Sequence, residues 1–150
     1  VRKSNGTSQG EVDAATIIEN LERDEGGNII ESIKIISHSM GGSYAKGYAE
    51  AILQYAKKHD IKGVLIAFEA DFAPYQSAEQ KAVKDDTMGP TLQFSHDEDS
   101  VAGNDPIKGA EQKDTSDDKE QGHSIFDFYN QIKKLPSGNY KVEKGKIIPE

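Results

Sequence analysis

Two apolar runs with one amphipathic segment between them constrain the fold of this chain more than any other feature. Residues 32–37 (Ser-Ile-Lys-Ile-Ile-Ser) and 63–68 (Gly-Val-Leu-Ile-Ala-Phe) have the β-branched and aliphatic content of buried strands. Residues 43–58 carry apolar side chains at helical spacing and end in Lys57 and Lys58, which complement a helix dipole. A strand–helix–strand order of this length predicts a crossover between parallel strands. We therefore expect an α/β fold with a mostly parallel sheet and flanking helices.

The other segments extend this pattern at both ends of the chain. Residues 1–10 are polar and rich in glycine and serine, which predicts a loop, whereas residues 11–23 repeat apolar side chains at helical spacing, which predicts a helix. The elements expected after residue 68 are a helix or surface excursion at 76–86, a weaker third strand at 91–94, a helix at 124–134 and a hairpin or edge strand at 140–148.

Length and charge exclude several classes of protein. A chain of 150 residues has the size of one domain. No apolar run approaches the roughly 20 residues that a membrane span needs, and the lack of Cys excludes disulfides and thiolate metal sites. The formal net charge of −8 repels phosphate backbones, which argues against a nucleic-acid partner. The first residue is Val1 rather than Met, which favours a processed product or an excised piece of a longer chain.

Most of the net negative charge lies between Asp97 and Glu120. This stretch holds nine acidic and three basic residues, which predicts a solvated loop. Its Asp-Glu-Asp run at 97–99 lacks the spaced acidic pattern of a calcium loop, so we expect neither a metal site nor a cofactor.

The junction between the first strand and the central helix carries the clearest chemical signal. Residues 37–42 read Ser-His-Ser-Met-Gly-Gly. A nucleophile elbow holds its serine in a tight strand-to-helix turn, so the residues two positions before and after it must be small, as Ser37 and Gly41 are. The same turn puts the Met40 backbone N–H at a helix N-terminus, where it is placed to stabilise an oxyanion. The alternative is that Ser39 is an ordinary helix N-cap.

With these residues between a strand and a helix, the sequence resembles the serine lipase and esterase branch of the α/β-hydrolase family, in particular lipases with a Gly-His-Ser-Leu/Met-Gly-Gly elbow. The resemblance runs from residue 11 to about His123 and implies a Ser–acid–His triad in that order. It departs from the family at Ser37, where the motif has glycine, and in having only about 30 residues before the elbow. The strands that usually precede the elbow are either missing from a smaller sheet or lie on a preceding part of a longer parent chain.

The sequence is also similar to lipase-like C-terminal modules of large repeat-bearing bacterial toxin polyproteins. This similarity implies secretion or delivery as part of a larger bacterial protein, with a membrane phospholipid or another acyl ester as substrate. It also implies an immunity protein or an N-terminal domain of the parent chain as partner.

The resemblance implies that the acid of the triad follows the third strand. Residues 94–101 (Phe-Ser-His-Asp-Glu-Asp-Ser-Val) are similar to the strand-then-Asp-x-Val element that carries this acid in lipases. The match favours Asp99, and Asp97, Asp71 and Asp105 remain as alternatives.

Four histidines are candidates for the base of the triad. His123 follows every acid candidate and opens the last expected helix, so we favour it, with His96 as the rival. His38 lies inside the elbow and is expected to point away from the Ser39 hydroxyl, and His59 ends a helix on the wrong side of the sheet.

These assignments predict a serine hydrolase that cleaves carboxylic esters through an acyl-enzyme. His123 takes the proton of Ser39 Oγ, Asp99 fixes the imidazole, and the Met40 N–H polarises the carbonyl group. The alternative from another class is a non-catalytic, hydrolase-like interaction module of a larger secreted protein, which keeps the layers of the fold but lacks a complete oxyanion hole.

Overall fold

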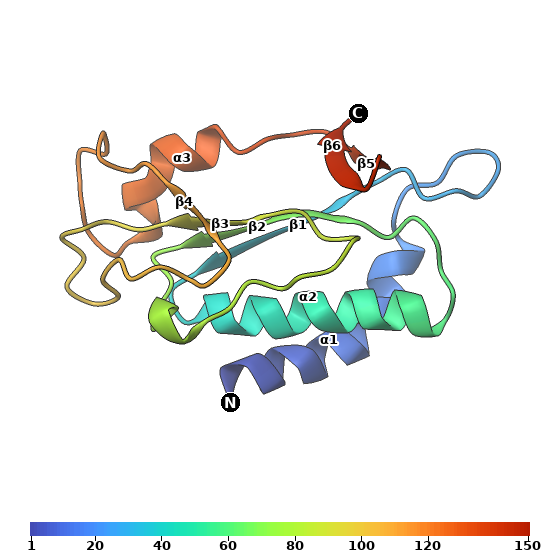
Figure 1. Cartoon of the computed structure of the whole chain (residues 1–150), viewed down its shortest axis with the longest axis horizontal. Coiled ribbons are helices and arrows are strands. Elements are labelled where there is room, and N and C mark those ends of the chain that lie inside the picture. The colour runs from blue at the N-terminus through green and yellow to red at the C-terminus, as the bar shows by residue number, and fades with distance from the viewer.

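Parallel strands form the centre of the molecule. The computed structural model describes residues 1–150, and its main sheet has the strand order β1-β2-β3-β4 with every neighbouring pair parallel. The strands are β1 (Ile33–His38), β2 (Ile66–Phe72), β3 (Thr91–Phe94) and β4 (Glu111–Lys113). Because all four run the same way, their carboxyl ends meet at one edge of the sheet, on the left of Figure 1.

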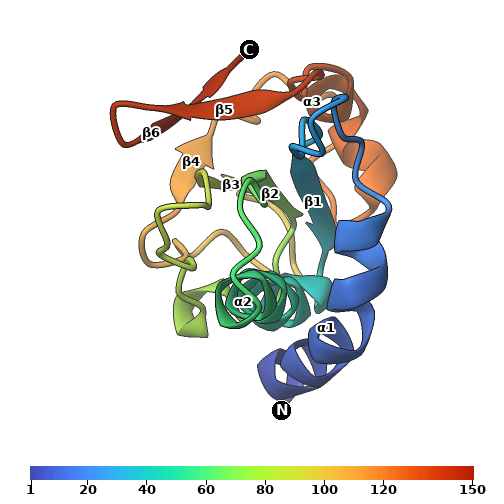
Figure 2. The ribbon, with the colours of Figure 1, turned by 90° about the vertical axis from the view of Figure 1, so that its right-hand side faces the viewer.

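Helices cover both faces of this sheet. Helices α1 (Arg2–Glu19) and α2 (Gly41–Lys58) lie on one face, and the 3-10 turn η2 (Ile125–Phe128) with the short helix α3 (Tyr129–Lys133) lies on the other, as Figure 2 shows end-on. The helix expected at 124–134 is therefore divided into η2 and α3. The chain belongs to the α/β class, with a parallel sheet flanked by helices.

The expected crossover between the first two strands is present. β1 and β2 pair in parallel on either side of α2, and β3 pairs in parallel with β2, so the predicted arrangement of three parallel strands is confirmed. β2 begins at Ile66 rather than at residue 63. Gly63 has φ +87°, a left-handed conformation that a strand does not contain, so the ladder starts beyond it.

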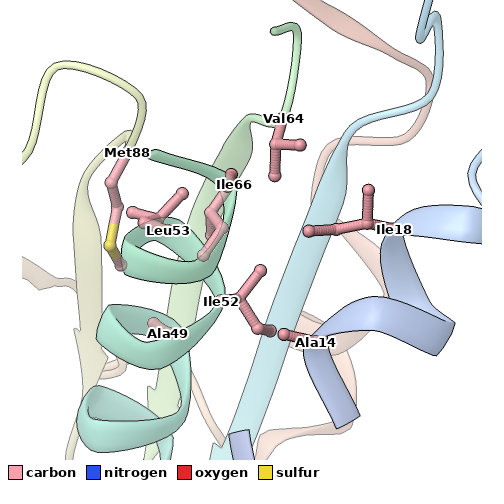
Figure 3. Close-up of a cluster of buried hydrophobic side chains, with 9 residues drawn as sticks. Ala14, Ile18, Ala49, Ile52, Leu53, Val64, Ile66 and Met88 are labelled. Atoms are coloured by element: carbon pink, nitrogen blue, oxygen red, sulfur yellow. The ribbon is translucent and has the colours of Figure 1, made fainter. Parts of the chain in front are cut away.

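Strand β2 separates two hydrophobic cores, and all seven of its residues are buried. The core between the sheet and helices α1 and α2 includes Ile18, Ile52 and Ile66 (Figure 3). The core on the opposite face contains Phe72 and Phe128. β2 contributes Ile66 to the first core and Phe68, Ala70 and Phe72 to the second, and its pairing with β1 is irregular between Ile66 and Phe68.

The first ten residues correct our expectation of a loop, because α1 begins at Arg2. Gly6 and Gly10 are buried against α2, and a Cβ atom at Gly6 would lie 2.0 Å from the Tyr44 carbonyl oxygen. A Cβ atom at Gly47 of α2 would lie 2.0 Å from the Lys3 carbonyl oxygen. The glycines that suggested a loop thus allow two helix backbones to touch, and this tertiary packing outweighs their low helix propensity.

The N-terminal end of α1 is attached to the segment that follows β2. The Arg2 guanidinium donates a hydrogen bond to Gln76 Oε1 (2.9 Å) and lies 5.3 Å from the centre of the Tyr75 ring. The Tyr75 N–H in turn donates to the Ser39 carbonyl oxygen (3.0 Å). Residue 1 therefore lies at the same end of the molecule as the carboxyl ends of the strands.

The acidic stretch from 97 to 120 is only partly the solvated loop that we expected. It contains β4, and Asp99, Ile107 and Asp118 are buried within it. The Lys108 carbonyl oxygen accepts a hydrogen bond from the Ala82 N–H, which ties this stretch to the segment after β2. That segment, at 76–86, is a surface excursion whose one helical turn is η1 (Ser77–Glu79).

The C-terminal hairpin is confirmed. β5 (Tyr140–Glu143) pairs antiparallel with β6 (Lys146–Pro149). The Ser32 hydroxyl donates to the Tyr140 carbonyl oxygen (3.1 Å) and accepts from the Tyr140 N–H (2.9 Å), which fixes the hairpin near the amino end of β1. None of the helices combines the length and the apolar character needed to cross a bilayer.

We predict that Gly47→Ala destabilises the protein, although alanine normally favours a helix over glycine. The added methyl group meets the Lys3 carbonyl oxygen and Thr7, so we expect the free energy of unfolding to fall by about 1–3 kcal/mol in urea titrations. The matched control is Gly41→Ala in the same helix, whose Cβ atom would meet nothing closer than 3.7 Å. Equal stability of the two variants would contradict the close contact between α1 and α2.

Candidate active site

The turn between β1 and α2 holds Ser39 in an unusual backbone conformation. Its φ is +56°, in the left-handed region that side chains other than glycine rarely adopt, at a cost of roughly 1–3 kcal/mol. The Ser39 N–H donates to the Phe72 carbonyl oxygen at the end of β2 (3.0 Å). A Cβ atom on Gly41 would lie 3.7 Å from the Ser37 Cβ atom, an ordinary van der Waals contact across the turn. This is the strained strand-to-helix geometry of a nucleophile elbow.

Three side chains that are distant in the sequence form a continuous hydrogen-bonded chain. His123 Nε2 lies 2.8 Å from Ser39 Oγ, and His123 Nδ1 lies 2.8 Å from Asp99 Oδ2. An ionised carboxylate only accepts hydrogen bonds, so Nδ1 carries the proton and Nε2 is free to accept from the serine hydroxyl. The Asp99 side chain is fully buried, whereas the His123 side chain is 22% exposed. The approach of His123 to Ser39 that the sequence led us to expect is therefore present.

Backbone groups keep the Asp99 carboxylate ionised. Burial raises the pKa of Asp99, but hydrogen bonds from the Ala102 N–H, from His123 and from the Val101 N–H outweigh it, so the pKa lies below its ordinary value. Both N–H groups donate to Asp99 Oδ1, at 2.8 Å and 3.0 Å. Val101 is 57% exposed, so its side chain does not anchor the loop in the core. The backbone of Val101 supplies the anchor instead.

The other acid candidates make different contacts. Asp97 is exposed and accepts a hydrogen bond from Asn104. Asp105 is also exposed, and its carbonyl oxygen accepts from Gln93. Asp71 is buried next to the elbow but accepts from Ser37 and Lys46 rather than from an imidazole. Of the four candidates, only Asp99 contacts His123.

Two of the remaining histidines support the segment that carries His123. His38 Nε2 lies 2.7 Å from the His123 carbonyl oxygen, and His96 Nδ1 lies 2.8 Å from the Gly122 carbonyl oxygen. His96 is fully buried, and its Nε2 contacts Asp118 Oδ2 (2.7 Å). His96, our rival candidate for the base, therefore binds the backbone of this segment rather than the serine. This support could not be inferred from the sequence, because it joins loops that only the fold brings together.

His59 and Met40 are the last two residues that the sequence singled out. His59 ends α2 at the other end of the helix from Ser39, and its ring lies tilted against the Tyr55 ring with 4.1 Å between the centroids. Met40 is the N-cap residue of α2, and its backbone N–H donates to no acceptor within the protein. This N–H is available at the start of a helix, next to Ser39, where the dipole favours negative charge.

A buried cluster of charged side chains lies next to the elbow, and the sequence analysis missed it. Lys46 Nζ is 2.8 Å from Glu69 Oε2 and 2.6 Å from Asp71 Oδ2, and the three side chains are at most 2% exposed. Burial and the negative charge of Asp71 raise the pKa of Glu69 to about 9, although Lys46 opposes the shift. At neutral pH Glu69 is therefore protonated and the cluster is neutral. The available signal was the pair Glu69 and Asp71 at alternate positions beyond an apolar run.

Comparisons of this chain with protein-family models, with curated proteins and with solved structures gave no match. The chain has no group of three or more His, Asp or Glu side chains placed to hold a metal ion. A groove of about 700 Å³ lies between α1 and α2 and includes Thr7, Gln54 and His59 but none of Ser39, His123 and Asp99. The hydrogen bonds that join Ser39, His123 and Asp99 are therefore the feature that points to a function.

We predict that Glu69 makes stability depend on pH. Its folded pKa of about 9 exceeds the ordinary value of 4.5, so the stability it contributes is full below about pH 4.5 and is lost as the pH rises through 9. The difference in the free energy of unfolding between the wild type and Glu69→Gln should therefore fall by on the order of 1 kcal/mol per pH unit between pH 5 and 9. Urea unfolding across this range measures it. A difference that does not change with pH would mean that Glu69 is ionised throughout.

Proposed function

We propose that the protein is a serine hydrolase of carboxylic esters with an α/β-hydrolase-like fold. The observation that carries the proposal is the hydrogen-bonded chain from Ser39 through His123 to Asp99, with 2.8 Å at each step. This arrangement activates a hydroxyl for nucleophilic attack: the serine lies on a strained turn, a histidine contacts its hydroxyl, and a buried carboxylate contacts the histidine.

The places of these residues in the fold support the family resemblance. Ser39 follows β1, Asp99 follows β3 and His123 follows β4, so nucleophile, acid and base occur in the chain order of α/β-hydrolases. All three lie beyond the carboxyl ends of parallel strands, where ligand sites of open α/β sheets gather.

Each side chain would have one role in the reaction. His123 Nε2 accepts the Ser39 Oγ proton as the oxygen attacks the ester carbonyl, and returns this proton to the leaving alcohol. Asp99 holds the imidazole through Nδ1 and stabilises its positive charge. The Met40 N–H donates to the oxygen that becomes negative. Water then attacks the acyl-enzyme and hydrolyses it, which restores the Ser39 hydroxyl.

Exposed apolar side chains that are close in the sequence to the triad residues support an apolar acyl group in the substrate. Met40 follows Ser39, Val101 is two residues after Asp99, and Phe126 is three residues after His123. They are 54%, 57% and 83% exposed, although large apolar side chains are normally buried. Acyl esters, phospholipids among them, offer the apolar surface that such side chains would cover.

We predict that an active-site fluorophosphonate labels Ser39. Mass spectrometry should find one adduct on the wild type and none on Ser39→Ala, which removes the nucleophile and little packing. Ser8→Ala, at an exposed serine of α1, is the matched control and should be labelled at the wild-type rate. Labelling of Ser39→Ala would place the nucleophile elsewhere. An unlabelled wild type would favour a non-catalytic interaction module.

We also predict that Asp99→Asn lowers ester hydrolysis by up to about 10⁴-fold, because the imidazole loses the partner that fixes its tautomer. Asp97→Asn is the control two residues away, and it should change the rate little because Asp97 is exposed and contacts Asn104. Initial rates on a short-chain ester measure both. A large loss in Asp97→Asn with a small loss in Asp99→Asn would reverse our assignment of the acid.

A further inference from the structure

The buried charged cluster touches the elbow on both sides of Ser39. On the β1 side, the Ser37 hydroxyl donates to Asp71 Oδ1 (2.6 Å), and Ser37 lies opposite Asp71 in the sheet. On the α2 side, Lys46 Nζ donates to the Gly42 carbonyl oxygen (3.2 Å) while it binds Asp71 Oδ2 (2.6 Å). One Lys46–Asp71 ion pair thus connects the residues two before and three after the nucleophile.

Core packing does not explain why this cluster is present. Burying charged groups costs free energy that their mutual attraction often fails to recover, and apolar side chains of similar size frequently stabilise a core more. Glu69 Oε1 is buried without a hydrogen-bond partner, which adds to the cost. The neighbouring core of α1, α2 and the sheet is apolar, so the fold does not need ions at this depth. The contacts with Ser37 and Gly42 are what the cluster adds.

The elbow is a segment that needs such support. Ser39 has φ +56°, and a strained conformation persists only where its surroundings hold it. Without restraint the turn would relax, and Ser39 Oγ would move away from His123 Nε2. Loss of this alignment slows a reaction without changing the groups that react.

We propose that Ser37, Lys46 and Asp71 form a clamp that positions Ser39 for attack, by holding the two ends of the elbow through one buried ion pair. This inference rests on the proposed ester hydrolysis, and it makes the three side chains positioning residues rather than catalytic ones. Glu69, in its protonated form, completes a cluster without net charge.

The first test removes the β1 side of the clamp. Ser37→Ala should lower kcat for a short-chain ester roughly 10- to 100-fold with KM nearly unchanged. The side chains that would bind the acyl group are intact in this variant, and only the nucleophile is misplaced. The matched control is Ser32→Ala, which removes a hydroxyl with two hydrogen bonds at the other end of β1 and should leave kcat unchanged. Wild-type kcat in Ser37→Ala would overturn the proposal.

The second test removes the α2 side. Lys46→Met alone strands the Asp71 charge and is expected to unfold the protein, so the variant to use is Lys46→Met with Asp71→Asn, which leaves no buried charge. The side-chain amide oxygen that this variant has at position 71 can still accept from Ser37, but the contact with the Gly42 carbonyl oxygen is lost. We expect kcat to fall roughly 10- to 100-fold while circular dichroism stays that of the wild type. A folded double variant with full kcat would overturn the proposal.

A third measurement separates the clamp from the chemistry. Amide hydrogen exchange followed by NMR reports the Ser39 and Gly42 N–H groups, which donate to the Phe72 and Ser39 carbonyl oxygens. In Ser37→Ala both should exchange at least tenfold faster than in Ser32→Ala. If the fluorophosphonate does not label the wild type but exchange is faster in Ser37→Ala than in Ser32→Ala, the proposed ester hydrolysis is wrong and the clamp is right. If the wild type is labelled but the two variants exchange at the same rate, the clamp is wrong and the proposed hydrolysis stands.

Discussion

The register between β1 and β2 determines where the elbow lies relative to the buried ion pair. It places Ser37 opposite Asp71 and His38 opposite Phe72, so the elbow leaves the sheet next to the buried ion pair. A shift by one residue would turn each side chain of β1 to the other face and separate these partners. β2 resists such a shift because it is buried along its whole length, with aromatic side chains in one core and Glu69 and Asp71 facing Lys46.

The parts of the fold that the sequence predicted are those with local signals. The β-branched run of β1 and the helical spacing of α2 predicted the crossover, because period and composition act over a few residues. The positions of Ser39 and His123 followed from chain order along a parallel sheet, which brings strand ends together. Asp99 was favoured over Asp97 by its place in a motif, whereas the contact that distinguishes them, a pair of backbone N–H groups at Asp99 Oδ1, depends on the shape of the loop.

The parts that the sequence did not predict depend on contacts between distant segments. Residues 1–10 looked like a loop because glycine disfavours helices in isolation, but Gly6 and Gly10 lie where α2 needs space. Nothing in the helical pattern of residues 43–58 marks Lys46 as buried, and only the fold brings it to Glu69 and Asp71. The same holds for His96, since its partner Asp118 comes from the stretch at 97–120 whose charge suggested full solvation. In each case the deciding partner is at least 22 residues away.

The attachment of Arg2 to the segment after β2 places residue 1 and residue 150 at different distances from the elbow. Arg2 contacts Gln76 and Tyr75, and Tyr75 binds the Ser39 carbonyl oxygen, so residue 1 lies beside the elbow. Glu150 follows the hairpin fixed near the amino end of β1, at the opposite end of the strands in Figure 1. Any domain joined before residue 1, that of a parent chain included, would therefore attach at the same end of the molecule as Ser39. A handle or surface tether placed after Glu150 would attach at the opposite end of the strands.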